Sequence, residues 1–323
     1  MLEQTFTQPA FTKTDKEEIY DVVIIGAGPA GMSAAVCAGR AMLKTLLIDK
    51  ALPGGQTATA YKIDNYLGFP QGILGSDLST KMEDQLRDHN VEFACEYVED
   101  IGETEGGAKI VKTDLGTNYK TRTVIVAPGL EPKKLDNELE RKFLGRGISY
   151  YAQCDVDYYK GKDVAVLGGG NCACYAADYL ADHVNKLYLI HRSDQIKAVK
   201  SLKEKVLSNP RIIPMWNSQV VDIFGLDKVE KIKLENVINR QYTWIDVKVI
   251  FVYVGRIPPK QILSLDLQVD EQGFIITDQY MRTNKRGIYA AGDIRSKQIR
   301  QIATAVSDGM IAAINVAREL SEK

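Results

Sequence analysis

Three cysteines lie in or near motifs that could use a thiol for chemistry. Cys172 and Cys174 follow a run of glycines at the predicted start of a helix, and Cys154 lies upstream, directly before Asp155. A cysteine in the first turn of a helix is expected to have a lowered pKa and to act as a reactive thiolate. The sequence therefore predicts thiol–disulfide chemistry, and other elements must position these sulfur atoms.

The first of these elements is a short β-branched run, Tyr20–Ile25, which is typical of a buried parallel strand. The glycine-rich turn Gly26–Gly31 follows, then a helix of small residues through Arg40. A second strand, Thr45–Ile48, ends at Asp49. This is the β-α-β pattern of a dinucleotide site, in which backbone amides and a helix N-terminus meet the pyrophosphate and the acidic residue meets a ribose.

The same pattern occurs again further along the chain. Asp163–Leu167 is an apolar strand that ends at Gly168-Gly169-Gly170, a helix is predicted over Asn171–Asp182, and a strand over Lys186–Ile190. A single glycine motif is a weak signal, but the strand-glycine-helix-strand context at both sites excludes most chance matches.

We therefore predict an α/β fold with two dinucleotide-binding domains, each Rossmann-like and three-layered, the second inserted into the first. Apolar strands that run into Gly or Pro at Val124–Gly129 and Phe251–Arg256 suggest the boundaries. The predicted parts are an N-terminal arm at 1–18, a first domain at 19–128 plus 255–323, and a second domain at 129–254.

Composition narrows the class of protein. The chain has 323 residues, a formal net charge of −1 and five cysteines. The near-zero charge, without long runs of one sign, argues against a nucleic-acid partner, and no apolar run is long enough for an integral membrane segment. The odd cysteine count argues against a secreted disulfide scaffold. We expect a cytoplasmic protein, and no metal site is predicted.

From about Tyr20 to Ala317 the sequence resembles the low-molecular-weight thioredoxin reductases. The segments that carry this resemblance are Gly26–Gly31 (GAGPAG), Leu52–Gln56 (LPGGQ), Asp64–Pro70 (DNYLGFP), Ala290–Asp293 (AAGD) and Arg300–Ala305 (RQIATA). The resemblance implies a flavin-dependent oxidoreductase with FAD bound by the first domain.

The resemblance also implies roles for single residues. Gly54, Gln56 and Asn65 would lie near the flavin ring and ribityl chain, Asp293 at the ribityl or phosphate end, and Gln301 near the isoalloxazine. The residues expected to bind FAD are Gly26, Gly28, Pro29, Ala30, Gly31, Asp49, Lys50, Gly54, Gly55, Gln56, Asn65, Ala127, Gly129, Gly292, Asp293, Arg300, Gln301 and Ile302.

The second site departs from the family pattern for NADPH. The family reads the 2′-phosphate with His-Arg-Arg-x-x-x-Arg, whereas this chain has Ser193 and Lys197 in place of two arginines and keeps Arg192. Serine carries no charge, and lysine cannot form a bidentate fork. Losing one charge-assisted contact costs roughly 1.5–3 kcal/mol, or about a ten- to hundred-fold loss of affinity.

Aromatic residues also appear in this region. Tyr175 stands where the family carries an acidic residue near the nicotinamide, and Tyr151 lies in the sulfur segment. Both rings could stack on a bound ring, or they could simply pack within the protein. The second site is thus expected to hold either a second FAD or weakly bound NAD(P)H. The residues expected there are Tyr151, Gly168, Gly170, Asn171, Tyr175, Arg192 and Lys197.

The sulfur site departs from the family as well. Tyr151 occupies the position of the partner cysteine, so Cys154 has no Cys-x-x-Cys partner. The resemblance implies that Cys154 is the sulfur that reacts with the flavin and that Asp155 handles the proton of the leaving thiolate. Cys172 and Cys174 point about 200° apart on a helix. Cys154 could pair more freely with either of them, and Cys154–Cys174 is favoured.

The remaining cysteines, Cys37 and Cys95, are expected to be core residues. The leading hypothesis is an FAD-dependent disulfide oxidoreductase with altered sulfur and NADPH sites, similar to the diflavin-linked enzymes of oxygenic photosynthetic bacteria. Two alternatives are an NAD(P)H- or ferredoxin-linked flavin reductase without a catalytic disulfide, and a non-catalytic flavin-binding redox sensor. The expected partner is a redox protein or a small disulfide or thiol, and the resemblance implies a homodimer.

Overall fold

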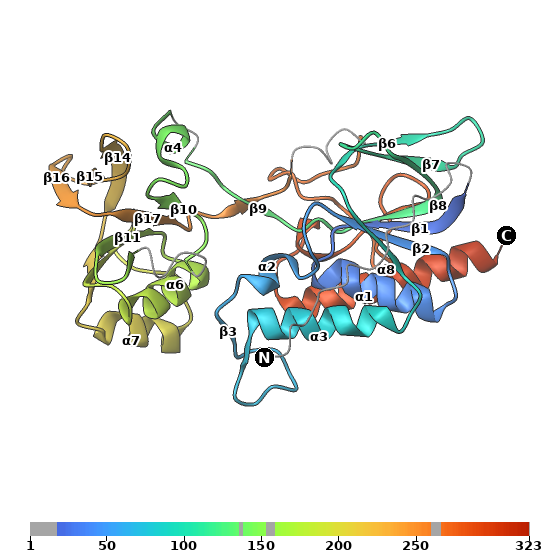
Figure 1. The fold of residues 1–323 in the computed structure, drawn as a ribbon, viewed down its shortest axis with the longest axis horizontal. Helices are drawn as coiled ribbons and strands as arrows, with labels where there is room; N and C mark the ends of the chain where they lie inside the picture. The colour runs from blue at the N-terminus through green and yellow to red at the C-terminus, as the bar shows by residue number, and fades with distance from the viewer. Residues whose placement is uncertain (1–17, 136–137, 153–158, 260–265, 323) are drawn as a thin grey trace, which may run out of the picture. The chain divides into compact units, whose positions relative to one another are not determined.

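The structure is a computed structural model that describes residues 18–135, 138–152, 159–259 and 266–322. The described residues form two compact units: one runs up to Leu130 and resumes at Pro258, and the other is Glu131–Ile257. Strands and helices alternate in both units (Figure 1), which confirms the predicted α/β fold. The predicted N-terminal arm, apart from residue 18, lies outside the described residues.

The first unit is built on a mixed sheet in the order β5-β2-β1-β8-β7-β6, with β19 beside β8. β1, β2, β5, β8 and β19 pair in parallel, and β6 and β7 form an antiparallel extension. The strands are β1 (Ile19–Ile25), β2 (Thr45–Asp49), β5 (Glu92–Cys95), β6 (Val98–Glu103), β7 (Lys109–Thr113), β8 (Asn118–Val126) and β19 (Ile288–Ala290), with the small pair β3 (Lys62–Ile63) and β4 (Ile73–Leu74) outside the sheet.

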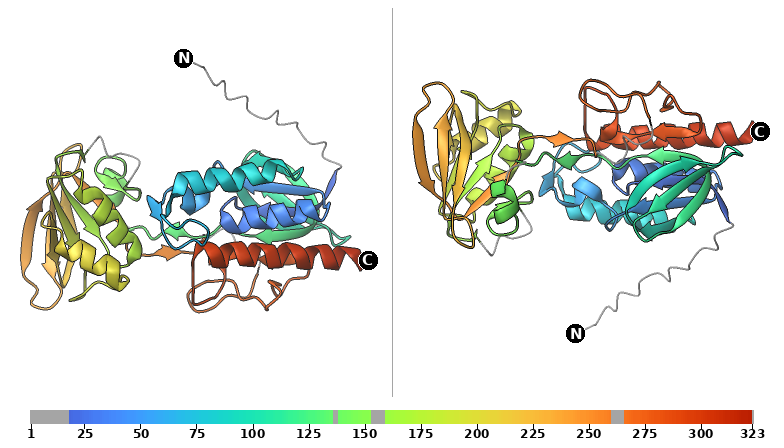
Figure 2. Two further views of the ribbon diagram at one scale, coloured as in Figure 1. Left: turned by 90° about the horizontal axis from the view of Figure 1, so that it is seen from below. Right: turned by 90° about the horizontal axis from the view of Figure 1, so that it is seen from above.

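Helices cover one face of this sheet (Figure 2). They are α1 (Pro29–Arg40), α3 (Gly75–Arg87) and α8 (Ile302–Ser321), with the short α2 (Gly55–Ala58) and the 3-10 turn η2 (Gly292–Ile294) near their ends. α8 comes from the far end of the chain and packs along α1.

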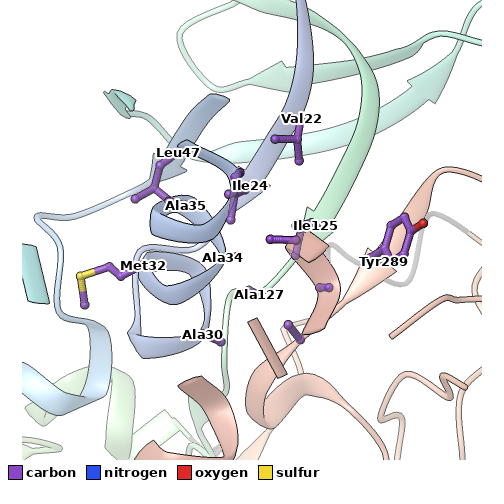
Figure 3. Packing of buried hydrophobic residues seen from close by; sticks show 14 of the residues in the cluster. Val22, Ile24, Ala30, Met32, Ala34, Ala35, Leu47, Ile125, Ala127 and Tyr289 are labelled. Atoms are coloured by element: carbon purple, nitrogen blue, oxygen red, sulfur yellow. The ribbon is translucent and has the colours of Figure 1, made fainter. Parts of the chain in front are cut away.

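Successive side chains of β1 point to opposite faces of the sheet and therefore pack into two different hydrophobic clusters. Val22 and Ile24 pack under the helices, whereas Val23 and Ile25 belong to the cluster on the other face. The small side chain of Ala34 lets α1 approach Ile24 closely (Figure 3). Full burial of each valine or isoleucine contributes about 1.5–3 kcal/mol, so the turn that joins β1 to α1 is anchored at both ends.

The second unit has three layers. Its parallel sheet runs β10-β17-β11-β12-β13, helices α6 and α7 cover one face, and the antiparallel sheet β14-β15-β16 covers the other. Its elements are β9 (Glu131–Pro132), α4 (Glu138–Phe143), β10 (Ile148–Ser149), β11 (Asp163–Leu167), α6 (Asn171–Ala181), β12 (Lys186–Ile190), α7 (Lys200–Ser208), β13 (Ile212–Met215), β14 (Ser218–Phe224), β15 (Lys231–Asn236), β16 (Tyr242–Asp246), β17 (Val249–Val252) and β18 (Arg256–Ile257).

Candidate functional site

The glycines of the first loop are required by close backbone contacts. Gly26 has φ of 101°, and an ideal Cβ there would lie 2.3 Å from the carbonyl oxygen of Ala127. A Cβ at Gly31 would lie 1.7 Å from the carbonyl oxygen of Gly26. A Cβ at Gly28 would meet open space. Gly26 and Gly31 therefore pack tightly against the backbone, while the space at Gly28, before the first turn of α1, is open for a bound pyrophosphate.

Asp49 ties the end of β2 to this loop. Its Oδ2 accepts the Ala27 N–H at 2.6 Å, and its Oδ1 accepts the Ala51 N–H at 3.0 Å. The carboxylate thus lies at the loop, as the sequence predicts for a ribose ligand. The ammonium group of the neighbouring Lys50 lies over the ring of Tyr97, 5.7 Å from its centroid.

The turn that leads into α2 is held against the same glycine loop. Gly54 has φ of 129° and donates its N–H to the carbonyl of Ala27 at 2.8 Å. A Cβ at Gly55 would lie 3.0 Å from the Cα of Gly28. Gln56 donates its side-chain amide to the carbonyl of Leu130 at 2.8 Å. This turn therefore lies beside the loop that is expected to bind the pyrophosphate. Gln56 connects it to Leu130, the last residue before the chain enters the second unit.

Residues far apart in the sequence meet at the start of α8. The side-chain amide of Asn65 donates to the side-chain oxygen of Gln301 at 2.9 Å, although 236 positions separate them. Gln301 is also the N-cap of α8 and forms a reciprocal capping box with Thr304. Ile302 is the first residue of the helix. The structure thus brings together two of the residues that the sequence assigns to the flavin.

Gly292 and Asp293 lie where the chain returns to the glycine loop. Gly292 has φ of 80°, and a Cβ there would be 2.8 Å from that of Ala30 in α1. Arg300 donates to the carbonyl of Asp293 at 3.1 Å, and its guanidinium lies 3.8 Å from the ring centroid of Phe274. These contacts fix the segment that carries Asp293 against the first turn of α1.

The second glycine loop has the same backbone design with different surroundings. Gly168 has φ of 139°, and a Cβ there would lie 2.4 Å from the carbonyl oxygen of Tyr253. Gly169 packs against the ring of His191, while a Cβ at Gly170 would meet open space. The Lys197 N–H donates to the carbonyl of Gly169 at 2.6 Å. The loop that carries the altered phosphate-reading residues is thus bonded to the glycine loop.

Charge gathers around this second loop. Burial lowers the pKa of His191, and the positive charges of Arg192 and Lys197 lower it further. Because His191 packs on Gly169, both cations act close to the loop. The side-chain oxygen of Asn171, the first residue of α6, accepts the Val199 N–H at 2.9 Å and so closes the same loop from the other side.

The two aromatic residues of the predicted second site differ in exposure. Tyr151 is 43% exposed, and its backbone N–H donates a hydrogen bond to Ser149 Oγ at 3.1 Å. Tyr175 is half-buried on α6, where it packs against the buried cluster of the second unit.

The predicted sulfur pair needs a correction at Cys174. Cys154 and Asp155 lie outside the described residues. Among the cysteines that the structure describes, Cys37, Cys95, Cys172 and Cys174 are all free thiols. Cys172 is exposed, but Cys174 is completely buried, and burial raises its pKa to about 11. The expectation of a lowered pKa is therefore wrong for Cys174, because the side chain enters the core instead of facing the helix N-terminus.

The expectation for Cys95 is also wrong. Cys95 ends the edge strand β5 and is exposed. Cys37 on α1 is half-buried against the core, and burial raises the pKa of its thiol.

Comparisons with known proteins agree with this geometry. The family model for pyridine nucleotide-disulphide oxidoreductases matches residues 20–309. The chain belongs to this family. It is 40% identical to a thioredoxin reductase of Listeria innocua over 310 residues, which cover 95% of this chain and 96% of that protein.

Two solved structures of family members are similar to the whole of the described fold. The thioredoxin reductase of Lactococcus lactis has a TM-score of 0.90 at 37% identity, covering 94% of this chain and 100% of that one. The thioredoxin reductase of T. acidophilum has a TM-score of 0.88 at 34% identity, with the same coverage. This member of the pyridine nucleotide-disulphide oxidoreductase family is therefore of thioredoxin-reductase type, and it is a flavin-dependent oxidoreductase.

The first site of this family member fits the FAD that the family uses. The open space at Gly28 and the positive φ of Gly54 and Gly292 let a ligand approach the backbone at the N-terminal end of α1. The carboxylates of Asp49 and Asp293 provide acceptors for hydroxyl groups there. In the described part of the chain, no group of three or more His, Cys, Asp or Glu side chains could hold a metal ion. Across the described ranges, no helix is long and apolar enough to cross a membrane.

Several residues that shape these sites are not part of any sequence motif. Asp308, Arg295 and Lys297 form a buried ion cluster behind Asp293. Ser79 on α3 packs beside Gly54. A motif search misses them because they lie outside the glycine patterns. The one signal in the sequence is the charged residues Asp293, Arg295 and Lys297 at alternate positions just after Gly292.

Proposed function

We propose that this protein is a thioredoxin-reductase-type FAD enzyme that acts on a small disulfide protein such as thioredoxin, with Cys154 as its flavin-side cysteine and without a Cys-x-x-Cys pair. The observation that carries this proposal is Tyr151 in the position of the partner cysteine, with Cys154 and Asp155 retained. The enzyme is also proposed to be a cytoplasmic homodimer, as the family resemblance implies.

The two ends of the sulfur segment belong to the same buried cluster as the first turn of α6. Ala152 and Tyr159, which flank the undescribed segment 153–158, belong to the same buried cluster as Ala173 and Cys174. Since Cys174 is buried with a raised pKa, we propose Cys172, the exposed cysteine of this turn, as the second thiol.

The proposed exchange balances as follows. The Cys154 thiolate attacks the substrate disulfide, one substrate sulfur leaves as a thiolate, and Asp155 supplies its proton. The Cys172 thiolate then attacks Cys154, releases the second substrate thiol and leaves a Cys154–Cys172 disulfide. The FAD of the family, when bound and reduced, supplies the two electrons that return this disulfide to two thiols.

We further propose that the second glycine loop binds a dinucleotide other than tightly held NADPH. Ser193 and Lys197 cannot supply the guanidinium groups that a 2′-phosphate needs. The tight glycine turn at Gly168 and the open space at Gly170 suit a pyrophosphate. A second FAD is the favoured occupant, and weakly bound NAD(P)H is the alternative.

The decisive experiment compares the wild type with Cys154→Ser, Cys172→Ser and Cys174→Ser. Thiol release from oxidised thioredoxin would be measured with chemically reduced holoenzyme, and flavin would be counted per chain after denaturation. The proposal expects two flavins per chain, loss of activity in the first two variants and retained activity in the third. Full electron transfer to other acceptors in Cys154→Ser would instead favour a flavin reductase without a disulfide. One flavin per chain would refute the second-flavin proposal, and no turnover with any acceptor would point to a redox sensor.

A further inference from the structure

A buried carboxylate lies behind the segment that carries Asp293. Asp308 on α8 is only 7% exposed. Its Oδ1 forms an ion pair with Nη1 of Arg295 at 2.8 Å, and its Oδ2 accepts a hydrogen bond from the ammonium of Lys297 at 2.9 Å. The backbone N–H of Gly292 donates to Oδ2 at 3.1 Å. A buried charge is costly unless it is paired and hydrogen-bonded, and two cations and one amide provide that compensation here.

The same residue lies beside a close contact between α8 and α1. A Cβ on the neighbouring Gly309 would be 2.0 Å from the carbonyl oxygen of Ala30, so α8 contacts the first turn of α1 there. Gly292 packs on the side chain of Ala30 from a separate direction. Asp308 therefore lies where the strand-end segment, α8 and the first turn of α1 meet.

Lys297 is shared between two carboxylates. Its ammonium lies 2.9 Å from Asp308 and 3.8 Å from Oδ1 of Asp293. It also lies 3.4 Å from Thr304 Oγ1. Both carboxylates carry negative charge, so removing one of them would draw the lysine towards the other.

We propose that Asp308 is a positioning residue for FAD binding. It holds the Gly292–Asp293 backbone against the first turn of α1, and it keeps the charge of Lys297 from pairing closely with Asp293. This inference rests on the proposed role of Asp293 as an FAD ligand. Asp308 touches neither FAD nor substrate and acts through these neighbours.

The test measures the dissociation constant of FAD by titrating apoprotein into FAD and following flavin fluorescence. Asp308→Asn keeps the size of the side chain but removes its charge, and we expect FAD affinity to fall roughly ten- to hundred-fold. Adding Lys297→Gln to that variant removes the displaced cation, and we expect it to restore at least about tenfold of the loss. The unfolding free energy of each variant is measured alongside, because a merely structural role would lower FAD affinity only in proportion to lost stability, whereas the proposed role changes FAD affinity in the folded protein.

Controls separate the possible failures. Asp270→Asn is a matched substitution on a neighbouring loop, where the carboxylate accepts a hydrogen bond from Ser296 Oγ at 2.6 Å, and it should leave FAD affinity unchanged within about threefold. If Asp293→Ala binds FAD as the wild type does, the proposed site is wrong, whatever Asp308 does. If Asp293→Ala weakens FAD binding but Asp308→Asn does not, or if Lys297→Gln gives no rescue, the present inference is overturned.

Circular dichroism would show whether each variant folds. If Asp308→Asn does not fold, Lys297→Gln alone still tests the inference, because it removes the cation without burying an unpaired charge on the helix. The inference expects this single variant to bind FAD at least as tightly as the wild type, within about threefold. A tenfold or greater loss would mean that Lys297 itself attracts FAD, which would contradict the role assigned to Asp308.

Discussion

The two cysteines of α6 should differ greatly in reactivity, although only one residue separates them. In the folded protein at pH 8, iodoacetamide is expected to label Cys172 readily and Cys174 hardly at all. Cys172 is exposed, whereas Cys174 is completely buried among apolar side chains. Alkylation requires both the thiolate form and access to the sulfur atom.

The pKa alone gives a lower limit for the protection of Cys174. Burial raises its pKa to about 11, so about one molecule in a thousand carries the thiolate at pH 8. An ordinary thiol with a pKa of about 8.5 is ionised in about one molecule in four at this pH. The expected slowing relative to such a thiol is therefore about 200-fold, before the exclusion of the reagent by the core is counted.

The assay is a timed alkylation that is quenched with excess thiol and followed by digestion and mass spectrometry of the peptide that carries both cysteines. Fragmentation assigns the label to one sulfur or the other. Repeating the reaction in denaturant provides the control, since unfolding should bring the two rates close together. If Cys174 is labelled within about tenfold of the rate of an exposed ordinary thiol in the folded protein, the argument from burial is wrong and Cys174 returns as a candidate for the sulfur pair.

Three further predictions concern stability and FAD binding. Gly31→Ala should cost about 1–3 kcal/mol of unfolding free energy because its Cβ would lie 1.7 Å from a backbone oxygen. Gly28→Ala, whose Cβ would meet open space, should keep the melting temperature of the wild type and weaken FAD binding. Equal melting curves for the two variants would contradict this. The unfolded chain loses the Cys174 proton near pH 8.5 and the folded one near 11, so stability should fall by up to about 3 kcal/mol across that range. Cys174→Ala should lack this alkaline loss in urea melts, and an unchanged pH slope would argue against it. Asn65→Ala removes the exposed bond to Gln301 and should weaken FAD binding several-fold while changing unfolding free energy by less than about 1 kcal/mol; a larger destabilisation would indicate a structural role.

The backbone of both sites was predictable because it follows local rules. The strand predicted over Asp163–Leu167 is observed with those bounds, and the one over Lys186–Ile190 likewise. A buried apolar run that ends at glycine leaves few alternatives to a parallel strand and a tight turn. The bond between Asn65 and Gln301 was not predictable, because it depends on how α8 returns to the first unit after more than two hundred residues.

The errors at the cysteines have a common physical cause. Two residues in helical positions i and i+2 face opposite sides, so the two sulfur atoms of α6 cannot both face the core, but the spacing does not say which one does. The positions of Ala173, Ala177 and Leu180 carry that information, since they form the apolar stripe to which Cys174 belongs. Cys95 was misjudged because an apolar run at a sheet edge exposes the residue that ends the strand.

The two glycine loops show which parts of such a site can change without loss of the fold. A position must remain glycine where a Cβ would overlap a carbonyl oxygen, as at Gly31 in the first loop and Gly168 in the second. Tyr151 and Ser193 have no such constraint, since Tyr151 is exposed and Ser193 lies in the loop whose Lys197 N–H bonds to Gly169. Substitution at these positions can therefore alter the sulfur and phosphate chemistry while both dinucleotide folds persist. A double variant that restores cysteine at 151 and arginine at 193 should then fold normally, and a gain of NADPH-dependent thioredoxin reduction would show that those side chains alone set the difference.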